Sequence, residues 1–232
     1  MSLNQPNKLL VKFFAKSEYK QAFLNGQVFC STPAYYRKAN KVGVADRCES
    51  AIYSHYNGFE PDDDIRLAIG LGKKFGVNKI NLKDCISFIL RQAREVDSWL
   101  NCWYLLDLTT TTPNSLADNL DRMLKEFGEH TVLLDMDNFG EFLQRIKKHS
   151  TKAVDFCTVQ YTENPFEISK YRKLSRYSYQ KEFRFMFGEC DFQCIEPYDT
   201  LLVPGGFRDL FMDGFWLGLD GCDDNRWPRF FK

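Results

Sequence analysis

The amino-acid sequence predicts an α+β fold: one domain over residues 1–232, built on a mixed or antiparallel sheet with a few packed helices. Apolar runs of strand length stand both before and after two central amphipathic helices. Strands and helices do not alternate as they do in parallel βαβ units. The chain of 232 residues shows no linker, and this length suits a single large domain.

The N-terminal part is expected to form a strand, a helix and a second strand, over residues 9–14, 18–25 and 27–31. Ser17 is of the residue type that caps helices. Gly26 stands where a left-handed residue would end the helix. We therefore expect a strand–helix–strand unit at the start of the domain.

The middle of the chain is less regular. Residues 36–84 are polar and contain several glycines, which predicts loops with short strands. The apolar run 99–106 is compatible with a helix or a strand, because periodicity does not separate the two at this length. The remaining predictions are strands over 85–90, 131–134, 154–161 and 201–203, and helices over 138–149 and from Ser115 to Gly128.

The clearest strand pattern runs from Tyr179 to Phe187, where polar and aromatic residues alternate. Gln180, Glu182 and Arg184 share one face, and phenylalanines occupy the other. If the polar face lies in solvent, Glu182 and Arg184 form an ordinary surface pair. If it lines a cleft, Glu182 can polarise a substrate hydroxyl or act as a base, with Gln180 beside it.

Charge and composition narrow the classes of protein. Lys+Arg 31 balance Asp+Glu 31, which argues against a protein that coats nucleic acid electrostatically. No run of about 18 apolar residues occurs, and the first residues lack the apolar core of a secretory signal. We therefore expect a cytoplasmic protein with no membrane partner. The cysteines are interpreted as free thiols, and no metal is expected because Cys190 and Cys194 form the only close pair.

Two hydroxyl residues, Ser31 and Thr32, end the second predicted strand, and Pro33 is expected to stop it. Their structural interpretation is that the hydroxyls bond nearby backbone. In a functional interpretation they hold a neighbouring catalytic side chain, while the rings of Tyr35 and Tyr36 stack on a flat heterocycle. Both interpretations stay open at this point.

Residues 170–184 mix basic and aromatic side chains, a combination that suits phosphate and base contacts. A solvated loop leading into a strand explains the same pattern. The residues predicted to contact a substrate or nucleic acid are Arg172, Lys173, Arg176 and Arg184.

Three short segments resemble a widespread family of bacterial and phage proteins that carry a domain of unknown function. They are Asp46-Arg-Cys-Glu49, Trp99-Leu-Asn-Cys-Trp-Tyr104 and a closing pair of strands, in which Val159-Gln-Tyr161 is followed by Tyr179-Gln-Lys-Glu-Phe-Arg-Phe185. The resemblance covers most of the chain in order, with short motifs.

A more distant similarity is to toxin-type ADP-ribosyltransferases. These combine an arginine on the first strand, a Ser-Thr-Ser-like strand end and a Gln-x-Glu or Glu-x-Glu strand. Ser31-Thr32 resembles the second element and Gln180-x-Glu182 the third, whereas the first strand offers Lys12 in place of arginine.

This similarity implies NAD as a substrate and a cytoplasmic toxin or phage-defence role. Glu182 would be catalytic and would bond a ribose hydroxyl beside an oxocarbenium-like centre, and Gln180 would orient an unknown macromolecular acceptor. Thr32 belongs to the same dinucleotide-binding segment. By the same resemblance, Ser31 would hold Glu182, Lys12 would contact the pyrophosphate, and Tyr35 or Tyr36 would stack on nicotinamide.

Two other functions remain open from the sequence. A non-enzymatic binding module would use an exposed apolar patch in the aromatic-rich tail 207–231, although the same residues could cover one end of the sheet. A nuclease would use Asp46, Glu49 and Glu182, but these lack the carboxylate–lysine spacing expected of a magnesium site.

Overall fold

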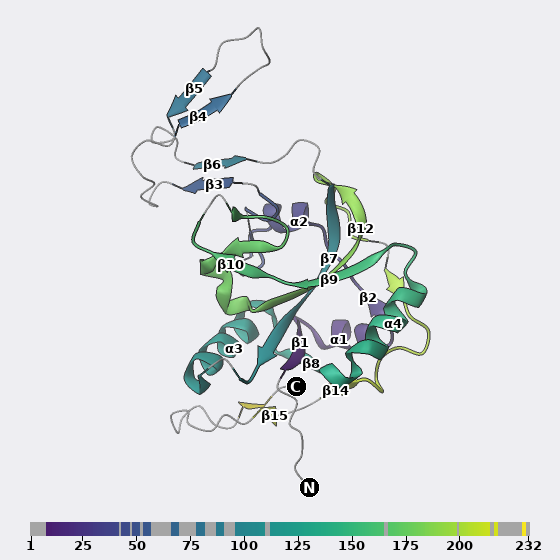
Figure 1. The fold of residues 1–232 in the computed structure, drawn as a ribbon. Helices are drawn as coiled ribbons and strands as arrows, with labels where there is room; N and C mark the ends of the chain where they lie inside the picture. Colours follow the sequence, from purple (N-terminus) through teal and green to yellow (C-terminus); the bar gives the residue numbers. More distant parts are fainter. Residues whose placement is uncertain are drawn as a thin grey trace.

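The computed structural model describes residues 8–41, 43–46, 48–51, 53–56, 66–69, 78–81, 87–90, 96–109, 112–164, 167–198, 200–213, 216–217 and 229–230. Its centre is a six-stranded sheet in which every neighbouring pair is antiparallel. In sheet order the strands are β14 (Phe211–Asp213), β8 (His130–Asp135), β1 (Lys8–Phe14), β7 (Val96–Asp107), β12 (Glu182–Asp191) and β9 (Val154–Thr158). This confirms the predicted α+β class with an antiparallel sheet (Figure 1).

Helices cover both faces of the sheet (Figure 1). Helices α1 (Ser17–Leu24) and α4 (Phe139–His149) pack on one face, against the phenylalanines of β12. Helix α3 (Pro113–Phe127) and the 3-10 helix η4 (Ser175–Gln180) cover part of the other. Within the described part of the chain, no helix is long and apolar enough to cross a membrane.

Shorter elements complete the fold. Strand β2 (Gln27–Val28) pairs with β13 (Leu201–Leu202), and β10 (Gln160–Thr162) pairs in parallel with β11 (Arg172–Leu174). Three further antiparallel pairs are β3 (Tyr53–Tyr56) with β6 (Ser87–Leu90), β4 (Arg66–Ile69) with β5 (Asn78–Asn81), and β15 (Trp216–Leu217) with β16 (Arg229–Phe230). Helix α2 (Pro33–Lys38) follows β2, and the 3-10 helix η2 (Met136–Asn138) precedes α4.

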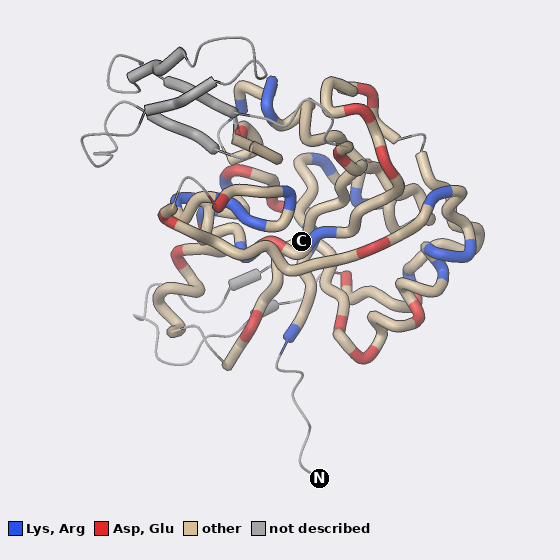
Figure 2. Tube along the Cα trace, turned by 45° about the horizontal axis from the view of Figure 1, so that its top comes forward, with Lys and Arg blue, Asp and Glu red and all other residues tan. Residues whose placement is uncertain are grey.

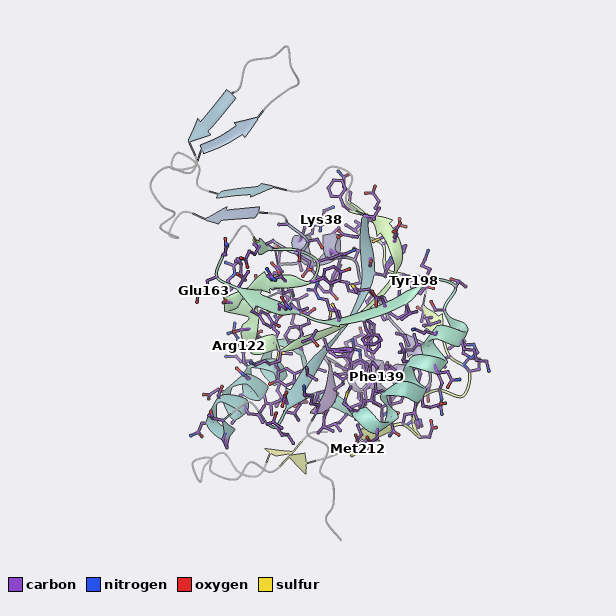
Figure 3. The ribbon with its side chains drawn as sticks, viewed as in Figure 1. Lys38, Arg122, Phe139, Glu163, Tyr198 and Met212 are labelled. Carbon is purple, nitrogen blue, oxygen red and sulfur yellow. The ribbon has the colours of Figure 1, made fainter. Side chains whose placement is uncertain are left out.

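The apolar face of the sheet carries an aromatic core. Phe23 of α1 packs with Trp103 of β7 and Phe142 of α4, with ring centroids 5.5 and 6.3 Å from Phe23. Phe185 of β12 is fully buried in the same cluster. Phe139 of α4, labelled in Figure 3, packs at the edge of this cluster with its ring centroid 6.0 Å from that of Phe185.

Most predicted elements are confirmed, with shifted ends. The ambiguous run 99–106 belongs to β7, and the predicted strand 154–161 is divided into β9 and β10. Gly26 and Gly128 both have positive φ at the ends of α1 and α3, as expected. Ser17, however, is the first residue of α1 and does not cap it.

Two predictions near the candidate residues are wrong in detail. The strand expected over 27–31 ends at Val28, and Pro33 begins α2 because proline is favoured in the first helical turn. The strand expected from Tyr179 begins at Glu182, since Lys181 has a left-handed φ of 40° that separates it from η4.

The sheet opens between its two central strands. Strands β1 and β7 pair only from Lys8 opposite Asp107 to Val11 opposite Tyr104. Past that point β1 continues against β8 alone, while β7 continues against β12. The two strands therefore separate, and the space between them is where the cavity described next is found.

Candidate functional site

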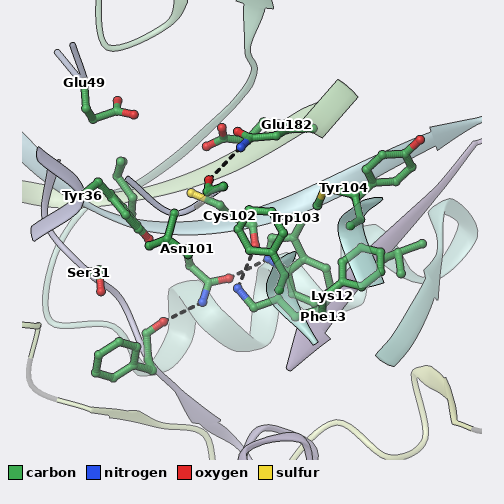
Figure 4. Close-up of a pocket in the computed structure, with 18 of the residues that line it drawn as sticks. Lys12, Phe13, Ser31, Tyr36, Glu49, Asn101, Cys102, Trp103, Tyr104 and Glu182 are labelled. Atoms are coloured by element: carbon green, nitrogen blue, oxygen red, sulfur yellow. Dashed lines mark hydrogen bonds between the residues drawn. The ribbon is translucent and has the colours of Figure 1, made fainter. Parts of the chain in front are cut away.

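A cavity of about 250 Å³ lies where β1 and β7 separate (Figure 4). Aromatic and aliphatic side chains from β1, β7 and α3 form much of its wall. It brings together six of the seven residues for which the sequence predicted a catalytic or dinucleotide-binding role: Lys12, Ser31, Tyr35, Tyr36, Gln180 and Glu182.

One wall of the cavity is a closed ring of four alternating charges. The Lys173 Nζ lies 2.7 Å from Glu182 Oε2 and 3.2 Å from Glu49 Oε2. Arg184 donates from Nε to Glu182 Oε1 at 2.6 Å, and both its terminal nitrogens bind the Glu49 carboxylate at 2.8 Å. All four residues are buried, and three of them line the cavity while Arg184 lies behind it.

The polar face of β12 was expected to lie either in solvent or along a cleft, and the buried charge ring shows that it lines the cavity. Glu182 and Arg184 are not a surface pair, because they lie under β11 and the 46–51 segment and are almost fully buried. The backbone N–H of Glu182 also donates to the Tyr161 hydroxyl at 2.9 Å. The carboxylate of Glu182 is therefore fixed in place and faces the cavity.

The ring keeps its carboxylates ionised. Burial opposes the charge of Glu182, but Arg184 and Lys173 outweigh it and lower its pKa. Burial likewise opposes ionisation of Glu49, and the same two cations lower its pKa. Burial alone would lower the Lys173 pKa, yet Glu182 and Glu49 raise it. An ionised carboxylate with a lowered pKa is a poor proton acceptor but a permanent source of negative charge.

Lys12 is a second cation on the cavity wall. Its Nζ donates to the Cys102 carbonyl at 2.8 Å and lies 5.3 Å from the centroid of the Trp103 ring. Burial lowers the pKa of Lys12. Unlike Lys173, it forms no ion pair within the described part of the chain. The chemistry of such a group favours an anionic part of a ligand.

The tyrosines predicted to stack on a ligand are consecutive residues of α2 and differ in their exposure to solvent. Their ring centroids are 5.7 Å apart and nearly perpendicular, at 77°. Tyr35 is 49% exposed, whereas Tyr36 points inward and burial raises its pKa. Phe29 also lines the cavity and is 59% exposed. Phe29 and Tyr35 therefore stand at the opening of the cavity.

Gln180 positions the cavity wall. Its Nε2 donates to the Gly43 carbonyl at 2.9 Å and to the Tyr179 hydroxyl at 3.2 Å, and its Oε1 accepts from Lys173 at 3.4 Å. Gly43 has a φ of +78°, and a Cβ there would meet the Glu126 carboxylate. Since the amide of Gln180 is committed to the protein, the structure gives no support to its expected role in orienting an acceptor.

Ser31 and Thr32 have different positions from those the resemblance implied. Ser31 pairs its backbone with Leu100, and it lies across the cavity from Glu182, which is held instead by Arg184 and Lys173 (Figure 4). Thr32 is fully buried outside the cavity, and its hydroxyl accepts from the Tyr35 backbone N–H at 3.1 Å. Thr32 is therefore the N-cap of α2, as the structural interpretation proposed.

The basic residues of the 170–184 stretch do not form one surface. Arg184 and Lys173 are buried in the charge ring, so a direct contact of either with a nucleic-acid backbone is a wrong prediction. Arg172 is half-exposed and pairs with Glu167 at 2.9 Å. Arg176 packs its guanidinium 5.0 Å from the Tyr177 ring. Of these four residues, Lys173 remains a candidate for substrate contact because it lines the cavity.

The three carboxylates considered for a nuclease do lie close together, but they surround the amine of a lysine. Asp46, Glu49 and Glu182 lie 3.8, 3.2 and 2.7 Å from the Lys173 Nζ, which occupies the point where their charges meet. Among the described residues, no group of three or more His, Cys, Asp or Glu side chains has an arrangement that could hold a metal ion. The six cysteines in the described ranges are free thiols.

Several residues of the site were missed by sequence reasoning or given another role. Glu49 was considered only for a nuclease, and the cavity role of Asn101 was not foreseen. Asn101 accepts from the Trp103 indole N–H at 2.6 Å and donates to the Phe29 carbonyl at 2.7 Å. The unusual Trp99–Tyr104 segment was the available signal, since it supplies the cavity wall along β7.

The apolar tail predicted for a binding module belongs partly to the core. Phe207, Leu210 and Phe211 are buried against α1, α4 and β7, so the described start of this segment covers the sheet, as the alternative expected of Phe211. The side chains of 214–232 lie outside the described residues. Comparison with family models, curated proteins and solved structures found no match for this chain.

Proposed function

We propose that this chain is an ADP-ribosyltransferase-like enzyme that cleaves the nicotinamide–ribose bond of NAD and transfers ADP-ribose to a macromolecule. The observation that carries the proposal is that Glu182, kept ionised by the charge ring, shares one cavity with Lys12 and Tyr35, although these residues lie up to 170 positions apart in sequence.

The state of Glu182 suits the reaction. As the C–N bond of nicotinamide breaks, its electron pair leaves with the ring nitrogen and positive charge develops on the ribose. A carboxylate that stays ionised stabilises this charge and accepts a hydrogen bond from a ribose hydroxyl. Arg184 and Lys173 lower the pKa of Glu182, so it supplies negative charge and does not serve as the proton acceptor.

The rest of the cavity suits the other parts of the dinucleotide. Lys12, without an ion-pair partner in the described part of the chain, would bind the pyrophosphate. Tyr35 and Tyr36 offer ring faces for the cationic nicotinamide of the oxidised dinucleotide. The acceptor nucleophile would then bond to the ribose carbon and lose its proton to solvent.

The test is turnover with labelled NAD by the parent protein, Glu182→Gln and Glu163→Gln. Glu163 is exposed and lies outside the cavity, so Glu163→Gln controls for the same chemical change. We expect Glu182→Gln to lower nicotinamide release about 10²–10³-fold, the usual loss when one electrostatic stabiliser is removed. The matched control should keep the parent rate.

Binding is measured alongside turnover, because Glu182→Gln leaves Lys173 and Arg184 with one carboxylate fewer. Calorimetry should show that a folded Glu182→Gln variant still binds the dinucleotide, with its loss confined to turnover. No heat of NAD binding to the parent, together with no nicotinamide release, would overturn the proposed function.

A further inference from the structure

Two aromatic side chains at the opening of the cavity face solvent. Phe29 and Tyr35 both line the cavity, yet they are 59% and 49% exposed. Phe29 follows β2, and Tyr35 lies in the first turn of α2. The ring faces they leave open are therefore continuous with the interior of the proposed active site.

The segment that forms this side of the opening is basic. Between Gly26 and Ala45 the sequence contains Arg37, Lys38 and Lys41 and no acidic residue. Arg37 is used internally, by an ion pair with the buried Asp97 at 3.1 Å. Lys38 and Lys41 are exposed and form no ion pair within the described ranges.

One lysine stands beside an aromatic ring, and the other, Lys41, lies two residues before Gly43, which lines the cavity. Lys38 follows Tyr35 by three residues on α2, which brings their Cβ atoms to about 5–6 Å on the same side of the helix. Figure 3 shows Lys38 at the α2 end of the molecule, far from Met212 on β14. Phe29, Tyr35, Lys38 and Lys41 are called the rim below.

The rim differs in charge from the rest of the molecule. Over most of the described chain basic and acidic positions are interspersed (Figure 2), in keeping with a net charge of zero. Inside the cavity, the two carboxylates of the ring are matched by Lys173 and Arg184. At the rim, positive charge adjoins exposed aromatic rings, and residues 26–45, which carry both, contain no acid.

We propose that the rim binds single-stranded nucleic acid and that this strand is the acceptor of the transfer reaction. The inference rests on the proposed function for the reaction but not for the binding. Bases stack on exposed aromatic rings while lysines contact the phosphates, a combination that tolerates many sequences. A base held on Phe29, or on the solvent-facing side of the Tyr35 ring, would lie at the opening of the cavity in which the nicotinamide–ribose bond breaks.

The test is fluorescence anisotropy with labelled single strands of about twelve nucleotides, one of deoxythymidine and one of uridine, in the absence of NAD. The parent should bind at low salt. Tyr35→Ala should weaken binding about tenfold, as the loss of one base–aromatic stack does. Lys38→Gln with Lys41→Gln should reduce the slope of log affinity against log salt by about 1.4, for two lost phosphate contacts.

Matched control variants test whether binding depends on the rim itself or on any exposed aromatic ring and any exposed pair of lysines. Tyr19 is 52% exposed and lies 5.4 Å from the Lys16 ammonium, but it does not line the cavity, so Tyr19→Ala should bind like the parent. Lys147→Gln with Lys148→Gln removes the same charge from the exposed last turn of α4. It should leave the salt slope unchanged.

Failure of this inference is distinguishable from failure of the proposed function. Absence of binding, or equal weakening by the rim and control variants, would overturn the rim as a nucleic-acid surface. If the parent releases nicotinamide but label appears on protein and not on either strand, the acceptor assignment falls while the proposed function stands. Oligonucleotide binding without any NAD turnover would overturn the acceptor role and retain the surface.

Discussion

The two faces of strand β12 carry different kinds of side chain, aromatic on one face and charged on the other. One face places Phe183, Phe185 and Phe187 in the aromatic core. The other places Glu182 and Arg184 in a ring of charges that is equally well buried. One strand thus supplies both the main apolar core and the wall of the proposed active site.

The comparison teaches how differently the two faces depend on their neighbours. An aromatic ring in the core contacts several others, so each contact is a small part of its stabilisation. A buried charge is stabilised by a few specific partners, and removal of one leaves another uncompensated. The stability of the charged face therefore depends on every member of the ring being present.

The largest expected effect on the free energy of unfolding comes from removing one cation from the charged face of β12. Arg184→Met leaves Glu49 and Glu182 buried with only Lys173 as a cation, which should cost about 3–5 kcal/mol of the free energy of unfolding. The matched change on the other face, Phe185→Ala, should cost a similar ~3–5 kcal/mol through a cavity. Denaturant unfolding measures both.

Arg172→Met is the control for the first change, because Arg172 pairs with Glu167 at a half-exposed site and should contribute no more than about 1 kcal/mol. A cost for Arg184→Met as small as that of Arg172→Met would show that the ring does not stabilise the fold as described.

A second, smaller effect is a dependence of stability on pH, which the charged face of β12 should produce and the aromatic face should not. The pKa values of Glu49 and Glu182 are lowered in the folded state, so their stabilisation is present above the unfolded value of about 4.3 and is lost as pH falls below it. Two such groups give a slope of up to about 2.7 kcal/mol per pH unit. Asp46, whose pKa burial raises, opposes this slope.

Denaturant unfolding between neutral pH and pH 3 measures this dependence. The Phe185→Ala variant should run parallel to the parent at lower stability, because its change is apolar. In Arg184→Met the folded-state pKa values of the two carboxylates should rise toward the unfolded value, so the slope below about pH 4.3 should shrink or reverse. Parallel profiles for all three proteins would contradict the assignment of the slope to the ring.

The smallest expected effect concerns Thr32, which belongs to neither face. Thr32→Ala removes the N-cap of α2 and should cost about 1 kcal/mol of stability. Thr32→Ser should retain most of it, since the serine hydroxyl can accept the same hydrogen bond. Calorimetric titration should give the same NAD affinity for the parent, Thr32→Ala and Thr32→Ser. A loss of affinity in Thr32→Ala alone would show that Thr32 contributes to dinucleotide binding.

The apolar face could be predicted from the sequence, because its cause is local. Alternation along β12 and helical spacing in α3 and α4 each place apolar residues on one side of a single element. The start of β12 was predicted wrongly because of a single backbone position, Lys181, where a left-handed φ ends η4 and the strand begins three residues later than expected.

The charge ring could not be predicted, because no local pattern encodes it. Glu49 and Arg184 are 135 residues apart, and Lys173 comes from a short parallel strand pair. The same Gln-x-Glu-x-Arg alternation fits a solvated surface, and only the packing of the 46–51 segment over it decides between the two. The residue types of the cavity were predictable by resemblance, whereas the partners that hold Glu182 were not.

The separation of β1 from β7 has a consequence for the range of ligands such a fold can accommodate. Pairing stops at Val11 opposite Tyr104, and the next pair would set Lys12 against Trp103. Extending the pairing by that one step would narrow the cavity, and ending it earlier would widen it. Either change would shift Trp103, whose ring packs on Phe23 of α1 and Phe142 of α4 in the aromatic core. The size of the ligand that fits the cavity is therefore coupled to the packing of the core through one residue of β7.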